Sequence, residues 1–346
     1  MAYTFQPAKV DTYENVDLTQ FNTLIRPKAE PAILRGAIAH WPAVKDADAK
    51  ALFKRLTALD NGKTQATLIG ATGTGGAFHY AANLRGRNYT EITETLSAAL
   101  TRLLENPTTD GTYIQSIPIP EHMPNFMGNH PFNLVPDGVP ARAWIGNQTT
   151  VQTHFDASEN IACVVLGTRE VTLFPPEELP GLYPGPLETA PGGVVVSLTS
   201  LDTPDFEAHP RFKDALKNAR RATLAPGDAL YIPFGWWHHV RATSPLNMLV
   251  NYWWTDKPAL LDDLYSPIVH AMLCYQQLNP QQAKIWQSMF THFVFKQNGE
   301  PMAHIPSELR GLLGGVPEKY RDRTIYGLLK TLGQAIGLAP PPDPKK

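Results

Sequence analysis

Ten short segments of strand-forming residues follow one another between residues 112 and 253, and they restrict the fold of this chain more than any other feature. Segments rich in Val, Ile, Thr and aromatic residues, bounded by Gly, Pro, Asn and Asp, are typical of β-strands. The predicted strands are residues 112–117, 141–145, 148–155, 160–166, 169–174, 193–197, 221–224, 229–232, 238–242 and 247–253. Short antiparallel strands at this density predict a mainly β fold, a double-sheet jelly roll (double-stranded β-helix).

Two turn sequences give more detail. Gly167-Thr168 stands between two predicted strands and predicts a tight hairpin. Pro226-Gly227-Asp228 precedes another strand and predicts a turn that fixes the register of that strand. The side chains after this second turn should therefore face a defined side of the sheet.

Helical patterns flank the predicted strands. Apolar residues recur at helical spacing over residues 46–59 and from Thr90 to Leu104, with a strand predicted at 65–70. The pattern is helical again at residues 260–278, 283–295 and 323–336. We expect an N-terminal α/β elaboration of the barrel at residues 1–111, a jelly-roll core at 112–257 and a C-terminal helical segment at 258–346 that packs on itself or on a partner subunit.

Composition excludes several classes of protein. The net charge is −2 with no long basic run, which argues against an extended surface for DNA. Cys163 and Cys274, the only cysteines, both lie among apolar residues and predict buried free thiols in a reducing compartment. No run approaches the roughly 20 apolar residues that span a bilayer, and residues 1–9 do not resemble a secretory signal. We therefore expect a soluble, cytoplasmic protein.

The sequence His154-Phe155-Asp156 is the strongest candidate for chemistry. Residues two apart in a strand project from the same face, so His154 and Asp156 can bind one metal ion. His238 or His239, on a distant predicted strand, would add a second imidazole, and alternation alone leaves both open. Two histidines and one carboxylate form the facial triad of non-haem Fe(II) oxygenases. Taken alone, the triplet is also compatible with a solvated strand end.

Several separate motifs occur in a fixed order along residues 31–254. They are Pro31-Ala32-Ile33-Leu34-Arg35-Gly36, Trp41-Pro42, His154-Phe155-Asp156, Phe174-Pro175-Pro176, Pro226-Gly227-Asp228, Tyr231-Ile232-Pro233 and Trp237-His238-His239-Val240. Together they resemble the cupin-like branch of the Jumonji-C family of Fe(II)/2-oxoglutarate-dependent hydroxylases, its asparaginyl hydroxylase members in particular. The resemblance implies a cupin fold and a dioxygenase that uses Fe(II), 2-oxoglutarate and dioxygen to hydroxylate a C–H bond of a protein or peptide side chain.

The resemblance also implies roles for individual residues. His154, Asp156 and His238 would be the iron ligands, with His239 packed or hydrogen-bonded nearby. Arg169 stands where the relatives carry a lysine that binds the far carboxylate of 2-oxoglutarate, and guanidinium suits a carboxylate equally well. The other residues implied to hold the co-substrate are Tyr113, Asn160 and Asn251.

One position departs from the family pattern. The relatives carry a threonine three residues before the first metal histidine, and Val151 occupies that place here. Thr150 or Gln152 would have to replace its hydrogen bond. The nearby tryptophans Trp236, Trp237, Trp253 and Trp254 fit core positions better than pocket positions.

Other functions remain compatible with the sequence. Within enzymes, the substrate could be a small molecule or an RNA nucleoside, although the near-neutral charge disfavours RNA. Outside oxygenases, the chain could be a metal-binding cupin that acts as an isomerase or a binding module. The C-terminal helices are expected to form a homodimer, as in the resembled hydroxylases.

Overall fold

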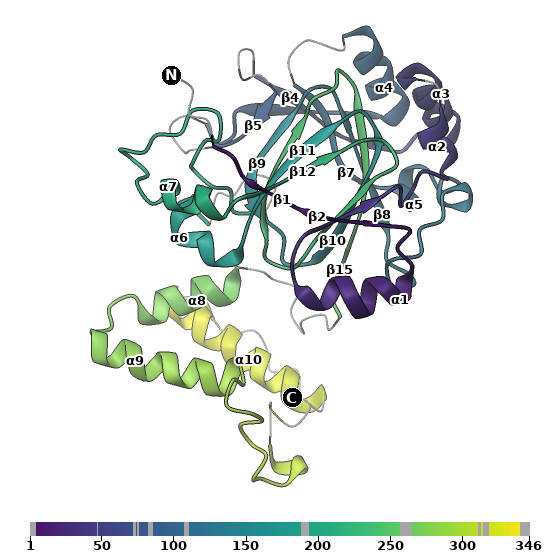
Figure 1. Ribbon diagram of the computed structural model, residues 1–346. Helices are drawn as coiled ribbons and strands as arrows, with labels where there is room; N and C mark the ends of the chain where they lie inside the picture. The colour runs from purple at the N-terminus through teal and green to yellow at the C-terminus, as the bar shows by residue number, and fades with distance from the viewer. Residues whose placement is uncertain are drawn as a thin grey trace. The chain divides into compact units, whose positions relative to one another are not determined.

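The computed structural model describes residues 5–46, 48–71, 74, 76–81, 86–106, 111–187, 194–256, 265–310, 313 and 318–339. The chain divides into two compact units, Met1–Asp262 and Asp263–Lys346. Every described strand lies in the first unit, whereas the described elements of the second unit are helical (Figure 1). Among the described helices, none is long and apolar enough to cross a membrane.

Two β-sheets form the body of the first unit. The smaller sheet contains, in spatial order, β1 (Ala8–Lys9), β12 (Arg220–Leu224), β11 (Arg169–Phe174), β14 (Trp237–Ala242), β9 (Thr150–Phe155) and β5 (Ala77–Phe78). The larger contains β2 (Asp11–Glu14), β3 (Ala32–Arg35), β13 (Ala229–Ile232), β10 (Glu159–Leu166), β15 (Asn247–Trp254), β8 (Ala141–Gly146), β7 (Thr112–Pro118), β4 (Thr64–Gly70) and β6 (Tyr89–Thr95).

Strands β8 to β15 contribute four strands to each sheet. Apart from β11 and β12, consecutive strands of this series lie in different sheets, which is the arrangement of a jelly roll. This is the fold class that the sequence predicts, and β7 to β15 match nine of the ten predicted strands. For the tenth, residues 194–197 form only isolated bridges, Val196 with His154 and Ser197 with Pro184, and residue 193 lies outside the described residues.

Helices cover the outer face of the larger sheet, as Figure 1 shows for α2 to α5. The helices of the first unit are α1 (Leu18–Gln20), α2 (Pro42–Lys45), α3 (Ala49–Leu59), α4 (Leu96–Glu105), α5 (Ile119–His122), α6 (Leu179–Leu182) and α7 (Phe212–Ala215). Side chains of β10 alternate between two cores: Ile161 and Cys163 pack toward the helices, while Val164 packs between the sheets. This alternation leaves one face of each sheet for the barrel interior.

Two local predictions are wrong. Gly167-Thr168 does not close a hairpin, because β10 and β11 lie in different sheets and the turn carries the chain from one to the other. Gly167 has a φ of +76°, and a Cβ there would lie 2.3 Å from Asn247 Oδ1, so glycine is required at this crossing. The helix predicted from Thr90 begins only at Leu96. Residues before it pair with β4 as strand β6, and the Thr95 side chain caps the helix by accepting from the Ala98 N–H.

The second unit contains α8 (Ser266–Tyr275), α9 (Pro280–Met289) and α10 (Glu318–Ala335). These helices coincide with the three predicted C-terminal helical segments, although residues 260–264 of the first segment lie outside the described residues. The predicted burial of Cys163 is confirmed, whereas that of Cys274 is wrong because its position in α8 is exposed. A capping box stabilises the start of α9, where Asn279 and Gln282 exchange side-chain-to-backbone hydrogen bonds.

One buried histidine joins the helical layer to a loop. The His130 Nδ1–H donates to the Phe126 carbonyl over 2.7 Å, and its Nε2 accepts from the Ala43 N–H over 3.1 Å. The ring also stacks on Phe126 with 3.9 Å between centroids. These two roles require neutral imidazole, and burial lowers the pKa of His130 below its usual range.

Replacing His130 with alanine should lower the free energy of unfolding by about 2–3 kcal/mol, because it removes the ring and leaves the Ala43 N–H unpaired. Chemical denaturation at neutral pH measures this change, with the exposed His304→Ala as control. Since the pKa of His130 is lowered in the folded state, its contribution is complete above about pH 6.5 and is lost as the pH falls toward the folded pKa. The pH dependence should therefore be shallower in the variant, and identical slopes would contradict this assignment.

Candidate metal centre

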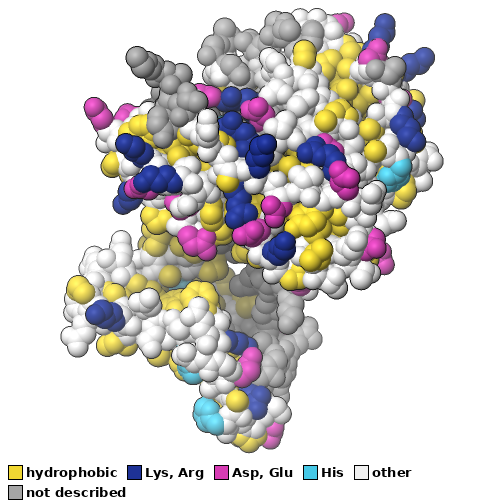
Figure 2. All heavy atoms as spheres, viewed as in Figure 1, with side chains coloured by type: hydrophobic (Ala, Val, Ile, Leu, Met, Phe, Trp, Pro, Cys, Tyr) yellow, Lys and Arg dark blue, Asp and Glu magenta, His cyan; other side chains and the backbone are white. Residues whose placement is uncertain are grey.

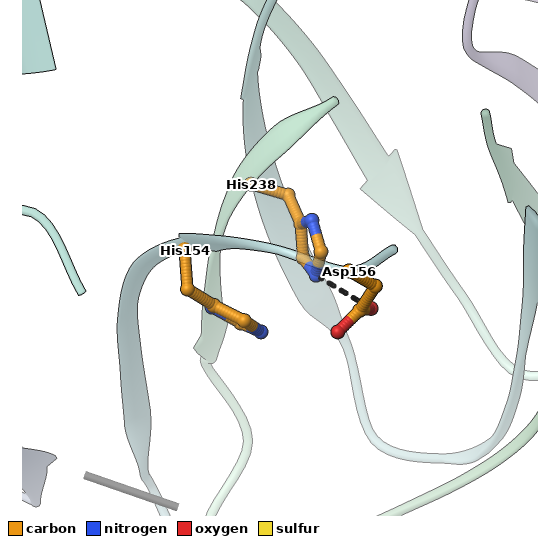
Figure 3. A group of neighbouring side chains, drawn as sticks. All are labelled: His154, Asp156 and His238. Carbon is orange, nitrogen blue, oxygen red and sulfur yellow. Dashed lines mark ion pairs between the residues drawn. The ribbon is translucent and has the colours of Figure 1, made fainter. Parts of the chain in front are cut away.

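Three side chains that can ligate a metal converge at one end of the barrel. His154 lies in β9, Asp156 directly follows that strand, and His238 lies opposite His154 in β14. One ligand atom from each lies within 4.8 Å of the other two, and Figure 3 shows the side chains pointing toward one another. The structure thus brings together the three residues that the resemblance implied as metal ligands.

A β-bulge in β9 sets which side chains face the barrel interior. Gln152 and Thr153 together lie opposite the single residue His239 of β14. The additional residue shifts the alternation, so that Val151 and His154, three positions apart, both line the interior cavity. Simple alternation along the sequence does not predict this pairing.

The bulge also determines which neighbouring residue can replace the family threonine that is missing at Val151. Gln152 lines the cavity, whereas Thr150 is not among the lining residues. Val151 packs beside an apolar cluster that contains Tyr113. Of the two possible replacements for the family threonine, only Gln152 has access to the cavity.

Both histidines are oriented by hydrogen bonds to the backbone carbonyl two residues earlier in the chain. His154 Nδ1 lies 2.8 Å from the Gln152 carbonyl oxygen, and His238 Nδ1 lies 3.0 Å from that of Trp236. Each Nδ1 therefore carries the proton, which leaves the Nε2 lone pair free for a metal. Burial and then the neighbouring His154 lower the pKa of His238 to about 4. Neutral imidazole is the form that a metal ion requires.

Asp156 is held by a chain of buried polar side chains. Its Oδ2 accepts from the Trp253 indole N–H over 3.1 Å and from Asn160 Nδ2 over 3.3 Å. Asn160 Oδ1 accepts in turn from Asn251, whose own Oδ1 accepts from the Trp144 indole N–H. Both asparagines named from the resemblance thus lie in one network that ends at the carboxylate.

A cavity of about 140 Å³ adjoins the three candidate ligands, which is room for several water molecules or a small organic anion. Its polar lining residues, besides the three candidate ligands, are Tyr89, Tyr113, Gln115, Trp144, Gln152, Asn160, Arg169, Asn251 and Trp253. The apolar ones are Leu68, Phe78, Val151, Ala162, Val194, Val196, Ile232, Val240 and Leu249. All four residues named as co-substrate ligands therefore face the same space.

Arg169 is the unusual group in this cavity. Its side chain is almost completely buried, and its Nε and Nη2 atoms have no hydrogen-bond partner among the described residues. The Tyr113 hydroxyl, whose pKa burial raises, is hydrogen-bonded to Arg169 and supplies no negative charge. A buried guanidinium without a counter-ion is costly, so this arrangement fits a site for an anionic ligand, such as a carboxylate.

The remaining residues singled out in the sequence lie elsewhere or act differently. His239 lies outside the group of candidate ligands, and burial and then Arg241 lower its pKa to about 3. Of the four tryptophans assigned to the core, Trp253 lines the cavity and contacts Asp156. Trp144 was not among the predicted site residues. Only its alternation with apolar residues of β8 could have placed it on the inner face.

Replacing Trp253 with phenylalanine should weaken Fe(II) binding about 10- to 100-fold, because Asp156 loses the donor that fixes its carboxylate. The metal dissociation constant of the anaerobic protein measures this effect. Trp254→Phe is the matched control, since the Trp254 indole N–H has no partner among the described residues. Equal weakening in the two variants would mean that lost packing, rather than the hydrogen bond, is responsible.

Comparison with known proteins shows which family and which relatives this chain is similar to. The profile of the cupin-like domain matches residues 18–260. The lysine-specific demethylase JMJ31 of Arabidopsis thaliana is 36% identical over 118 residues, which are 33% of this chain and 21% of that protein. Human HSPB1-associated protein 1 is 29% identical over 154 residues, 43% of this chain and 31% of that protein. The Jumonji C domain-containing protein 5 of Drosophila melanogaster is 26% identical over 250 residues, 68% of this chain and 57% of that protein.

The chain spans between 21% and 57% of the length of these three relatives. The profile nevertheless covers strands β3 to β15 and all three candidate metal ligands. The resemblance stated from the sequence motifs is thereby confirmed, and the chain belongs to the cupin-like domain family, alongside Jumonji C proteins.

Proposed function

We propose that this protein is an Fe(II)- and 2-oxoglutarate-dependent dioxygenase that hydroxylates a C–H bond of a protein or peptide side chain. The observation that carries the proposal is the buried Arg169, which has no carboxylate partner among the described residues and lines the same cavity as His154, Asp156 and His238. A metal-binding cupin of another activity has no need for a buried cation beside its metal. A dicarboxylate that reaches from the metal to Arg169 explains both features together.

Each group of residues has a defined task in this proposal. His154, Asp156 and His238 would hold Fe(II) on one side only, and the bound metal would supply activation of dioxygen with 2-oxoglutarate. Arg169 and Tyr113 bind the far carboxylate, and Asn160 and Asn251 keep the Asp156 carboxylate oriented. The apolar lining of the cavity excludes water from the reacting C–H bond.

The names of the relatives support a protein substrate. Three of the similar proteins are named lysine-specific demethylases, from Arabidopsis thaliana, Xenopus tropicalis and Danio rerio. Removal of an N-methyl group by an oxygenase begins with hydroxylation of the methyl C–H bond, so hydroxylation is the reaction common to both outcomes. Release of formaldehyde from the substrate would distinguish demethylation from stable hydroxylation.

The direct test is binding of 2-oxoglutarate with and without Fe(II) under anaerobic conditions, followed by succinate formation after oxygen is admitted. We expect binding to depend on Fe(II) and succinate to form slowly without added substrate. If the wild-type protein with Fe(II) does not bind 2-oxoglutarate, the oxygenase proposal is wrong and a cupin of another activity replaces it.

We also propose that the C-terminal unit forms a homodimer. None of the described side chains of α8 and α9 is buried, although both helices carry apolar residues. The exposed ones include Ile268, Met272, Leu273, Ile285, Trp286 and Met289. Figure 2 shows hydrophobic side chains on the surface of this unit between charged ones. Helices of this length need an apolar face covered to be stable, and a second copy provides the same face by symmetry.

Sedimentation of the full chain at micromolar concentration should give a species of twice the monomer mass of 38.2 kDa. The double variant Leu273→Glu with Ile285→Glu should sediment as a monomer, whereas Lys284→Glu, next to Ile285 on α9, should remain a dimer. A monodisperse wild-type monomer would contradict the proposal.

A further inference from the structure

An arginine lies on the inner face of the larger sheet near the candidate metal centre. Arg142 lies in β8 opposite Asn251 of β15. Trp144, two residues further along β8, lines the cavity, so alternation directs Arg142 to the same face. The Arg142 guanidinium lies over the Trp253 ring, 5.9 Å from its centroid, and the N–H of that ring contacts Asp156. Arg142 is thus separated from a candidate metal ligand by a single side chain.

A local distortion of β7 holds Arg142 in place. The register between β7 and β8 shifts between Ile114 and Ile117, and Ser116 within this bulge has a φ of +55°. Ser116 presents two acceptors to the same guanidinium: its Oγ to Arg142 Nε over 2.6 Å and its carbonyl to Nη2 over 2.7 Å. A left-handed conformation is strained for serine, so the surrounding contacts must hold it in place. The bulge fixes one edge of the guanidinium and leaves Nη1 available.

Arg142 has no acidic partner among the described residues. None of the carboxylates in the described part of the chain forms an ion pair with it, whereas Arg26, Arg55 and Arg102 each have one. Glu121 is near enough to affect Arg142, but it is paired with Lys63. Arg142 is half-buried, and this burial lowers the pKa of its guanidinium while leaving it charged. A positioned, partly desolvated cation without a counter-ion is a site for an anion.

We propose that Arg142 recognises a carboxylate of the prime substrate, so that the hydroxylated residue is itself acidic or lies beside an acidic group. This inference rests on the proposed oxygenase function and adds the chemical class of its substrate. Arg169 is enclosed in the cavity and suits the co-substrate, while Arg142 is half-buried near the same metal centre and suits a group that enters from outside. The two arginines thus separate two carboxylates that would otherwise compete for one site.

The test compares peptide pools on the full-length protein with Fe(II) and 2-oxoglutarate, kept anaerobic to prevent turnover. The peptides are labelled, about ten residues long and otherwise randomised, as suits binding in an extended form. One pool has blocked ends and a central Asp or Glu, the second has Asn or Gln there, and the third has Asn or Gln and a free carboxyl terminus. Fluorescence anisotropy gives the dissociation constant for each pool.

We expect the wild-type protein to bind the acidic pool at least about tenfold more tightly than the amide pool. Arg142→Met should abolish this preference, and Arg142→Lys, which retains the charge, should keep part of it. Arg26→Met is the matched control, because Arg26 also lies over a tryptophan, Trp254, but is already paired with Asp256. It should keep the full preference. Tight binding of the third pool would identify a chain terminus as the source of the carboxylate.

Three results would overturn the proposal. The first is equal or undetectable binding of all pools by the wild-type protein, and the second is a preference that survives in Arg142→Met. The third is Arg142-dependent binding of a single-stranded oligoribonucleotide in preference to every peptide pool, which would assign Arg142 to a phosphate. Binding of 2-oxoglutarate is measured on the same sample, so that failure of the Arg142 proposal and failure of the oxygenase proposal can be distinguished. Co-substrate binding without acid preference removes only the role of Arg142, and acid preference without co-substrate binding removes only the oxygenase.

Discussion

Replacing Asp156 with alanine will reduce succinate formation by about a thousandfold or more, to the level without enzyme. The variant leaves two neutral imidazoles to hold a dication and removes the only negative charge of the ligand group. It also leaves the Trp253 indole N–H and the Asn160 amide without their shared acceptor. Succinate release and the Fe(II) dissociation constant should therefore change together.

Two further variants locate the cause of that loss. Asp156→Asn keeps the shape but loses the charge, so its Fe(II) affinity should fall nearly as far. Glu159→Gln removes a carboxylate three residues away, which accepts from the Tyr231 hydroxyl and has no contact with the ligand group. It should retain wild-type Fe(II) affinity. If Asp156→Ala bound Fe(II) as tightly as the wild type, Asp156 would not be a metal ligand.

Replacing Arg169 with methionine will raise the KM for 2-oxoglutarate about a hundredfold, which corresponds to about 2.7 kcal/mol of lost binding. Arg169→Lys keeps the charge but not the forked geometry, so an intermediate loss of roughly tenfold is expected. Steady-state succinate formation at varied 2-oxoglutarate measures both. An unchanged KM in Arg169→Met would remove this residue from the co-substrate site.

Arg169 itself, as a buried charge, should lower the free energy of unfolding when no ligand is bound. Removing Arg169 alone leaves the buried Tyr113 hydroxyl without its partner, and this cost offsets the stability gained by removing a buried charge. The double variant Arg169→Met with Tyr113→Phe removes both partners, and its melting temperature without ligands should equal or exceed that of the wild type. With Fe(II) present under anaerobic conditions, saturating 2-oxoglutarate should then stabilise the wild type but not the double variant. A strongly destabilised double variant would indicate a structural role for the pair.

Much of the fold and site is encoded in local patterns. Strand length, turn residues and the triplet at residues 154–156 depend on neighbours in the chain, so the jelly roll and the pair His154 and Asp156 could be predicted. The choice of His238 over His239 came only from the resemblance to relatives. The position of Gly167 between the two sheets could not be predicted, because a glycine turn is equally compatible with a hairpin and with a crossing from one sheet to the other. The helix start at Thr90 was wrong for a similar reason: Ile92 and Leu96 fit a helical stripe, but pairing of residues 89–95 with β4 outweighed it.

Features of the site that depend on distant parts of the chain were not predictable from periodicity. The bulge in β9 exists only relative to β14, and it places Val151 rather than Thr150 at the cavity. Trp253 was assigned to the core because aromatic residues in strands usually are core residues, and its contact with Asp156, 97 residues away, leaves no local signal. Arg169 could be named only through resemblance to relatives, since nothing in its neighbourhood marks a buried charge.

The alternation of consecutive strands between sheets has a consequence for folding kinetics. Hydrogen bonds that build the site join residues 97 and 107 positions apart, so large loops must close before the candidate ligands meet. Topologies with such high contact order fold in milliseconds to seconds rather than microseconds. Metal binding needs β9 and β14 paired in the smaller sheet, and we expect this long-range pairing to form after the folding transition state. The ion should therefore slow unfolding while leaving the rate of folding unchanged. The metal therefore prolongs the lifetime of the native state without guiding the chain toward it.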